Sequence, residues 1–182
     1  MNLFESTVAQ ETVYRGAIVN VRRDKIKLPD GSDGRREVVE HPGGVAICAV
    51  DGENRVIMVR QYRYAVGEAL LELPAGKLEP GEDPLASALR ELEEETGAVP
   101  AEVIPMGFTY SSPGIFAEKI YYYLARKLHE GEAKPDEGEF LEVEKVPLES
   151  LLAMIREDRL RDGKSVIGIL KASLLLSAEA KE

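Results

Sequence analysis

The sequence predicts an α+β protein in which a mixed β-sheet is covered by helices. Short runs of apolar and β-branched residues, separated by turns rich in Gly, Asp and Pro, fill most of the chain up to residue 147. One amphipathic helix interrupts these runs, and two more helical stretches follow them. At 182 residues and 44% hydrophobic content, the chain can form one domain with a sizeable core, with or without a short accessory sheet.

The first strands are expected at residues 12–29 and 36–40, around a turn at residues 29–31. A second hairpin is expected from residues 45–50 and 55–62, and its first strand is apolar on both faces and therefore central. The remaining strands are predicted at residues 70–73, 102–108, 119–126 and 140–146, and the last two helices at residues 148–157 and 165–178.

The central helix carries an unusual density of acidic residues. Glu91, Glu94 and Glu95 are spaced i, i+3 and i+4, so that their carboxylates project from one face. Residues 82–95 contain six acids against Arg90 alone, and like charges at this spacing repel. A divalent cation would offset the repulsion, and oxygen ligands of this kind suit Mg²⁺ or Mn²⁺.

Both ends of this helix are predicted from local signals. Asp83 is a suitable N-cap, Pro84 suits the first helical position, and Gly97 suits the residue after the last turn. Between them lies a predicted apolar stripe that docks the helix on a core, made of Leu85, Ala88, Leu89 and Leu92.

The segment Gly76–Ala98 resembles the Nudix box, Gly-x5-Glu-x7-Arg-Glu-U-x-Glu-Glu-x-Gly-U, at every fixed position from Gly76 to Gly97. Ala98 is a small occupant of the last aliphatic position. The resemblance implies a metal-dependent hydrolase of nucleoside diphosphates linked to another moiety. It also implies an α/β/α sandwich with a mixed sheet, comprising residues 43–182, preceded by an N-terminal antiparallel sheet, residues 1–42, that serves dimerisation and substrate contacts.

Three segments outside the box resemble the ADP-ribose pyrophosphatase branch of this family. They are Arg35–Gly44, Arg60–Tyr64 and Glu72–Gly76, and Pro113 adds a proline 16 residues after Gly97. The resemblance implies hydrolysis of ADP-ribose to AMP and ribose 5-phosphate. Relatives that cleave GDP-mannose or other nucleoside-diphosphate sugars share much of this pattern and remain the alternative, and a non-catalytic nucleotide-binding module is a further one.

Site roles follow from the resemblance, residue by residue. Glu91 and Glu95 are the implied principal metal ligands, with Glu94 as a third ligand or a water-holding partner and the carbonyl of Ala75 completing the shell. Arg90 is implied to orient the carboxylates, and Glu82 to be either a second-shell ligand or a staple between loop and helix. Substrate contacts are implied for Arg36, Glu37, Arg63, Gly76 and Pro113, where a guanidinium such as that of Arg63 can bond two phosphate oxygens at once.

The general base is left open among three glutamates. Glu118 matches the position of a catalytic loop glutamate in this branch and is the favoured candidate. Glu137 and Glu139, in the polar loop Ala133–Glu139, are its rivals.

The composition of the chain bears on its binding partners and on its cellular location. A formal charge of −10 without a dense Lys/Arg patch argues against nucleic-acid binding, and no apolar run approaches the ~20 residues that span a bilayer. A start without signal-peptide features and a single cysteine, Cys48, expected as a buried thiol, favour a soluble cytoplasmic protein. The resemblance further implies a homodimer.

Overall fold

The computed structural model describes residues 2–136 and 138–179 and contains two compact units. The smaller unit comprises the described residues up to Gly43 together with Tyr110–Lys119, and the larger one comprises Gly44–Thr109 and the described residues from Ile120 onward. Within the described part of the chain, every helix is too short or too polar to cross a lipid bilayer.

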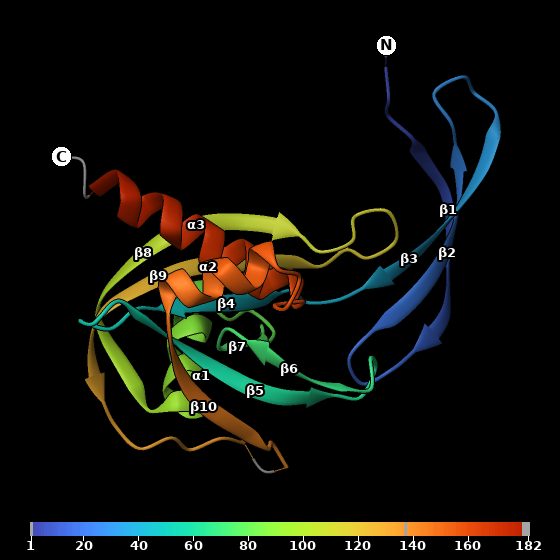
Figure 1. The fold of residues 1–182 in the computed structure, drawn as a ribbon. Helices are drawn as coiled ribbons and strands as arrows, with labels where there is room; N and C mark the ends of the chain where they lie inside the picture. Colours follow the sequence, from blue (N-terminus) through green and yellow to red (C-terminus); the bar gives the residue numbers. More distant parts are fainter. Residues whose placement is uncertain (1, 137, 180–182) are drawn as a thin grey trace. The chain divides into compact units, whose positions relative to one another are not determined.

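The smaller unit is built on an antiparallel sheet in the order β1-β2-β3, formed by Ser6–Arg15, Asn20–Lys27 and Asp33–Glu40 (Figure 1). The predicted turn between β2 and β3 is confirmed, since the Gly31 N–H donates to the Leu28 carbonyl (2.9 Å) and Gly31 adopts a positive φ of 86°. The single strand expected at residues 12–29 is wrong. The chain reverses between β1 and β2, where the Gly16 N–H donates to the Val19 carbonyl, and apolar Ile18 and Val19 hide this turn in the sequence.

The larger unit contains two sheets. Strands β5 (Arg55–Arg63), β6 (Glu68–Glu72) and β10 (Leu141–Pro147) form an antiparallel sheet in the order β10-β5-β6. Strands β4 (Gly44–Ala49), β7 (Ala75–Lys77), β8 (Ala98–Tyr110) and β9 (Lys119–Glu130) form a mixed sheet in the order β7-β4-β9-β8, in which β4 is parallel to β9 and antiparallel to β7.

Strand β4 is the centre of the larger unit, as its apolar sequence predicts. Its odd-numbered residues, such as Ile47, pack with Ala88 and Leu92 of α1 (Pro84–Thr96), and its even-numbered residues, such as Cys48, pack with Ile169 of α3 (Gly163–Glu179). Helix α1 therefore covers one face of β4 and α3 the other, with α2 (Leu148–Arg156) beside α3 (Figure 1). The predicted sandwich is confirmed.

The expected hairpin of β4 and β5 is wrong in its pairing. The turn is present, because the Asp51 N–H donates to the Arg55 carbonyl (2.9 Å), but Val50 and Val56 form only an isolated bridge. Beyond that bridge the two strands join different sheets, since β4 is apolar on both faces and is flanked by β7 and β9. Cys48 is fully buried, and burial raises the pKa of its thiol to about 12, which confirms a core residue.

Candidate active site

Helix α1 begins and ends where its sequence predicts. The Asp83 carboxylate accepts the N–H groups of Leu85 (3.0 Å) and Ala86 (3.1 Å), and Pro84 occupies the first turn. At the other end Gly97 has a φ of 74° and donates to the Glu93 carbonyl. The apolar stripe is narrower than predicted, because Leu85 is 39% exposed whereas Ala88 and Leu92 are fully buried.

Two carboxylates of α1 lie against strand β7. Glu95 is only 2% exposed and accepts the N–H of Ala75 at 3.1 Å. The Glu91 carboxylate occupies the space beside Gly76, where an added Cβ would lie 1.9 Å from its carboxyl carbon. A side chain at position 76 would therefore displace Glu91, which explains in physical terms why the box needs glycine there.

Desolvation disfavours the ionised form of both carboxylates. Desolvation raises the pKa of Glu95 to about 8, and the negative charges of Glu139 and Glu91 add to the rise. Desolvation also raises the pKa of Glu91, against the opposing effect of Arg90. Two oxygen-rich groups with this shortage of positive charge fit a hard divalent cation, which would stabilise their ionised forms.

Arg90 forms ion pairs with three acids of the box. Its guanidinium lies 3.1 Å from Glu82, 2.8 Å from Glu94 and 2.9 Å from Glu91. Glu82 also accepts the N–H of Glu79 in the loop before the helix, and the hydrogen bonds from Arg90 lower its pKa to about 2. Of the two roles considered for Glu82, the geometry matches the staple between loop and helix.

Glu94 faces Arg90, so the three predicted metal-ligand carboxylates are not gathered around one point. Among residues 2–136 and 138–179, no three acidic, histidine or cysteine side chains form a ready metal cluster. Glu91 and Glu95 are the two box acids on the β7 side. Ala75 meets this pair through its N–H, and a contact through its carbonyl remains a prediction.

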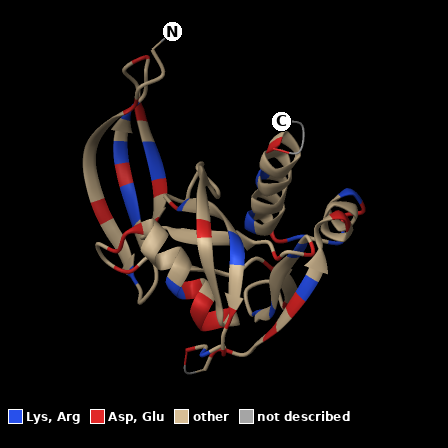
Figure 2. Cartoon of the chain, turned by 90° about the vertical axis from the view of Figure 1, so that its left-hand side faces the viewer, with Lys and Arg blue, Asp and Glu red and all other residues tan. Residues whose placement is uncertain are grey.

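A cleft of about 820 Å³ opens beside these carboxylates. Its walls come from the end of β5, strand β7, helix α1 and the loop before β10, and include Arg63, Gly76, Arg90, Glu91 and Glu139. Figure 2 shows the acidic residues gathered along the second half of α1. Glu139 accepts a hydrogen bond from the Gln61 amide (3.0 Å), and Glu137 lies outside the described residues.

Arg63 reaches the cleft but is already paired. Its Nε and Nη2 donate to the two oxygens of Glu72 at 2.7 and 2.6 Å, and Glu72 is only 1% exposed. Sequence reasoning did not assign a role to Glu72. The available signal was a carboxylate directly after the apolar run of β6, where burial requires a cationic partner.

The remaining predicted residues belong to the smaller unit. Glu118 lies 3.3 Å from the Nδ1 atom of His41, and both side chains are largely buried. Pro113 lies exposed in the turn that the Ile115 N–H closes on the Ser112 carbonyl (3.1 Å). The roles of Glu118 as general base and of Pro113 as a substrate contact stay predictions.

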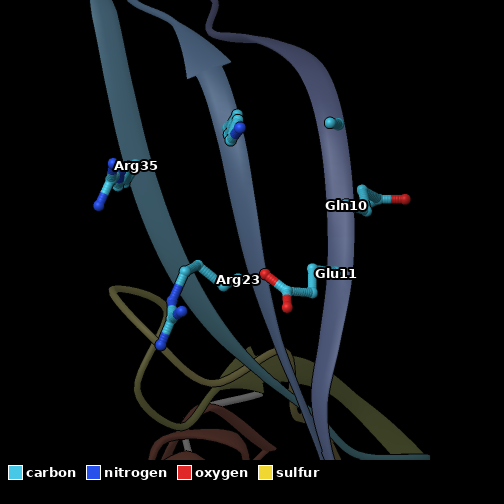
Figure 3. A pocket seen from close by; sticks show the side chains of 6 residues that line it. Gln10, Glu11, Arg23 and Arg35 are labelled. Atoms are coloured by element: carbon cyan, nitrogen blue, oxygen red, sulfur yellow. The ribbon is translucent and has the colours of Figure 1, made fainter.

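Arg36 and Glu37 take part in ion pairs on the N-terminal sheet. Arg36 pairs with Glu5, and Glu37 lies 3.7 Å from Arg23. Arg35, which precedes Arg36 in β3, lines a hollow of about 340 Å³ with Arg23 and Lys25. Figure 3 shows Arg23 and Arg35 on neighbouring strands, with Glu11 across from Arg23.

Comparison with known proteins gives two family matches. Residues 40–166 match the NUDIX domain, and residues 5–39 match the nucleoside diphosphate sugar hydrolase N-terminal domain. Together the two matches span almost all of the described chain.

Curated relatives cover most of the sequence. An ADP-ribose pyrophosphatase of Bacillus subtilis is 38% identical over 100% of this chain and 99% of its own length. A methanol dehydrogenase activator of Bacillus methanolicus is 41% identical over 91% of this chain and 90% of its own. A GDP-mannose pyrophosphatase of Citrobacter koseri is 34% identical over 73% of this chain and 74% of its own.

A solved structure described as an ADP compounds hydrolase shares the fold, with a TM-score of 0.86, 21% identity and complete coverage of both chains. The box geometry on α1 and β7 and the match over residues 40–166 agree on one family. The chain therefore belongs to the Nudix superfamily and is a Nudix pyrophosphohydrolase.

Proposed function

We propose that this chain hydrolyses the pyrophosphate bond of ADP-ribose, with water, to AMP and ribose 5-phosphate. The observation that carries the reaction class is a pair of neighbouring carboxylates with raised pKa values: Glu91, which lines the cleft, and Glu95, which is buried behind it on the same helix. The choice of ADP-ribose is supported by the pyrophosphatase of Bacillus subtilis, which matches this chain over its full length.

Mg²⁺ is the proposed cofactor, and Mn²⁺ would fit the same oxygen ligands. Glu91, Glu95 and the carbonyl of Ala75 would hold it, and Glu94 could join them or hold a water by exchanging its contact with Arg90. When bound, the metal would neutralise charge on the phosphates and lower the pKa of the attacking water. Arg90 contributes by keeping Glu91 and Glu94 oriented through charge-assisted hydrogen bonds.

The remaining roles are proposed for residues of both units. Arg63 would bind a phosphate, and Gly76 would let the substrate approach the β7 backbone. Arg36, Glu37 and Pro113 are proposed substrate contacts. Glu118 is the proposed general base, and its contact with His41 would hold its carboxylate in one orientation.

A second candidate substrate is GDP-mannose or another nucleoside-diphosphate sugar. The similarity to a GDP-mannose pyrophosphatase over 73% of the chain favours it specifically. A non-catalytic binding module has less support, because every acid of the box is present and two of them have raised pKa values.

We further propose that the active form is a cytoplasmic homodimer. Strand β1 is exposed along its whole length, and its apolar residues include Val8 (60% exposed) and Tyr14 (58%). An exposed edge strand with these apolar side chains would gain stability by packing against a second copy. The buried thiol of Cys48 agrees with a reducing compartment.

Replacing the proposed catalytic carboxylates tests the mechanism. Glu95→Gln and Glu91→Gln are expected to lower kcat for ADP-ribose with Mg²⁺ by about a hundredfold or more, since metal catalysis contributes several kcal/mol. Glu118→Gln is expected to lose kcat as well, whereas Glu93→Gln, exposed on the same helix, should retain it. Near-full kcat in Glu118→Gln beside a large loss in Glu95→Gln would transfer the role of base to another residue.

The stability of the metal-free protein should depend on pH through Glu95. Its folded pKa of about 8 lies above its ordinary value of 4.5, so the unfolded chain releases the proton first as the pH rises. The stability that Glu95 contributes is therefore complete below pH 4.5 and is lost as the pH rises to about 8. Urea unfolding in EDTA should show this decline, and Glu95→Gln should flatten it. An unchanged slope in the variant would exclude Glu95 as its source.

A hydrolysis panel tests the substrate. We expect ADP-ribose to have the highest kcat/KM in Mg²⁺ among ADP-ribose, GDP-mannose, NADH and diadenosine polyphosphates, with AMP as the nucleotide product. Reaction in H₂¹⁸O locates the attacked phosphorus. Faster release of GMP from GDP-mannose than of AMP from ADP-ribose would favour the second candidate.

Sedimentation tests the dimer. At micromolar concentration the protein should sediment at twice the chain mass of 20.0 kDa, because the exposed face of β1 would be covered in the dimer. Val8→Lys, on that strand, should shift the equilibrium toward the monomer. A wild-type species of one chain mass under the same conditions contradicts this expectation.

A further inference from the structure

Glu72 is a buried carboxylate with two cationic partners. Arg63 from β5 binds both of its oxygens, and Lys164 from the first turn of α3 contacts Oε2. Glu72 is 1% exposed, whereas the side chain of Arg63 is 39% exposed and lines the cleft beside the box carboxylates. Lys164 is 16% exposed and is absent from the residues that line this cleft. One partner therefore faces the substrate cleft and the other does not.

Lys164 is held in place from the α3 side. Asp162 accepts hydrogen bonds from the Lys164 ammonium (3.0 Å) and the Ser165 N–H (3.0 Å), and Ser165 is fully buried. The Ser165 hydroxyl in turn accepts the N–H of Leu73 at 2.7 Å. These bonds fix the first turn of α3 to the chain between Glu72 and β7, so Lys164 has little freedom to leave Glu72.

The packing of α3 keeps Lys164 close to Glu72. Gly168 lies directly over Leu73, and a Cβ added at Gly168 would come within 2.5 Å of the Leu73 side chain. The close approach of α3 to Leu73, the residue after β6, places the start of α3 beside Glu72. Lys164 is thus part of a rigid contact and not a mobile surface lysine.

A phosphate in the cleft would compete with Glu72 for Arg63. If Arg63 transfers its hydrogen bonds to a phosphate, Lys164 is the cation that stays beside Glu72. A buried carboxylate without a cationic partner is strongly destabilising, so an isolated Arg63–Glu72 pair would resist this transfer. A second cation beside Glu72 lowers the penalty.

We propose that Lys164 is a positioning residue that keeps Glu72 neutralised, so that Arg63 can transfer its hydrogen bonds from Glu72 to a phosphate of the substrate. This inference rests on the proposed function, in which Arg63 binds a phosphate. Lys164 itself touches neither substrate nor metal and acts only through Glu72 and Arg63.

A double-mutant cycle on ADP binding tests the proposal. Calorimetry with ADP and Mg²⁺ should show that Lys164→Met raises the Kd by about tenfold, the scale of a charge-assisted hydrogen bond, while Lys164→Arg stays near the wild type. In the Glu72→Gln background, Lys164→Met should change the Kd by less than about twofold, because no buried charge remains to neutralise. With ADP-ribose as substrate, Lys164→Met should raise KM and leave kcat nearly unchanged.

Two further variants separate this role from a general effect on folding. Lys164→Gln keeps a hydrogen-bond donor without the charge and should lose ADP binding as Lys164→Met does. Lys171→Met removes another lysine of α3, one that donates to the Met106 carbonyl, and should leave the ADP Kd unchanged.

An equal loss of ADP binding from Lys164→Met in both backgrounds overturns the proposal, as does wild-type affinity in Lys164→Met or no ADP binding by the wild type. A failure of the proposed function would give a different result from a failure of this proposal. In that case the wild type would leave ADP-ribose intact while the cycle on ADP binding still gave the expected coupling.

Discussion

The candidate site depends on two neighbouring carboxylates of helix α1 that face strand β7: Glu95, which is buried, and Glu91, whose side chain is 15% exposed. Their burial is unfavourable by itself, and the raised pKa of both groups reports that strain. It is tolerated because α1 is fixed by its caps and by its contact with β4, and because Gly76 leaves room for a carboxylate. A divalent cation bound at both carboxylates would stabilise their ionised forms.

Two further acids near the carboxylates of α1, Glu82 and Glu94, have a cationic partner within the protein. Arg90 pairs with Glu82, Glu94 and Glu91, but desolvation still raises the pKa of Glu91 and of Glu95, so these two are the groups most in need of a cation. The same distinction appears at Glu72, where two cations serve one buried carboxylate and only one of them, Arg63, faces the cleft. The two carboxylates with raised pKa values, Glu91 and Glu95, are thus the ones at which we propose a metal.

The features that sequence reasoning predicted are local ones. The caps at Asp83 and Gly97 and the spacing of the box acids depend on residues within a few positions of one another, so the pattern was sufficient. The pairing of Arg63 with Glu72 and Lys164 joins three elements far apart in the sequence, and no local pattern encodes it.

The errors of the sequence reasoning have the same origin. The turn after β1 has no strong breaker apart from Gly16, so two strands appeared as one. Strands β4 and β5 follow each other through a good turn yet join different sheets, because the partners of β4 come from distant segments. The exposure of Leu85 likewise depends on how far the core extends beneath α1.

The central claim is that Glu91 and Glu95 together bind a divalent cation. Anomalous diffraction from crystals grown with Mn²⁺ tests it most directly. The account predicts an anomalous peak in contact with both carboxylates, with Arg90 still paired to Glu82. A peak elsewhere, or no peak in a protein that hydrolyses its substrate with Mn²⁺, would contradict it.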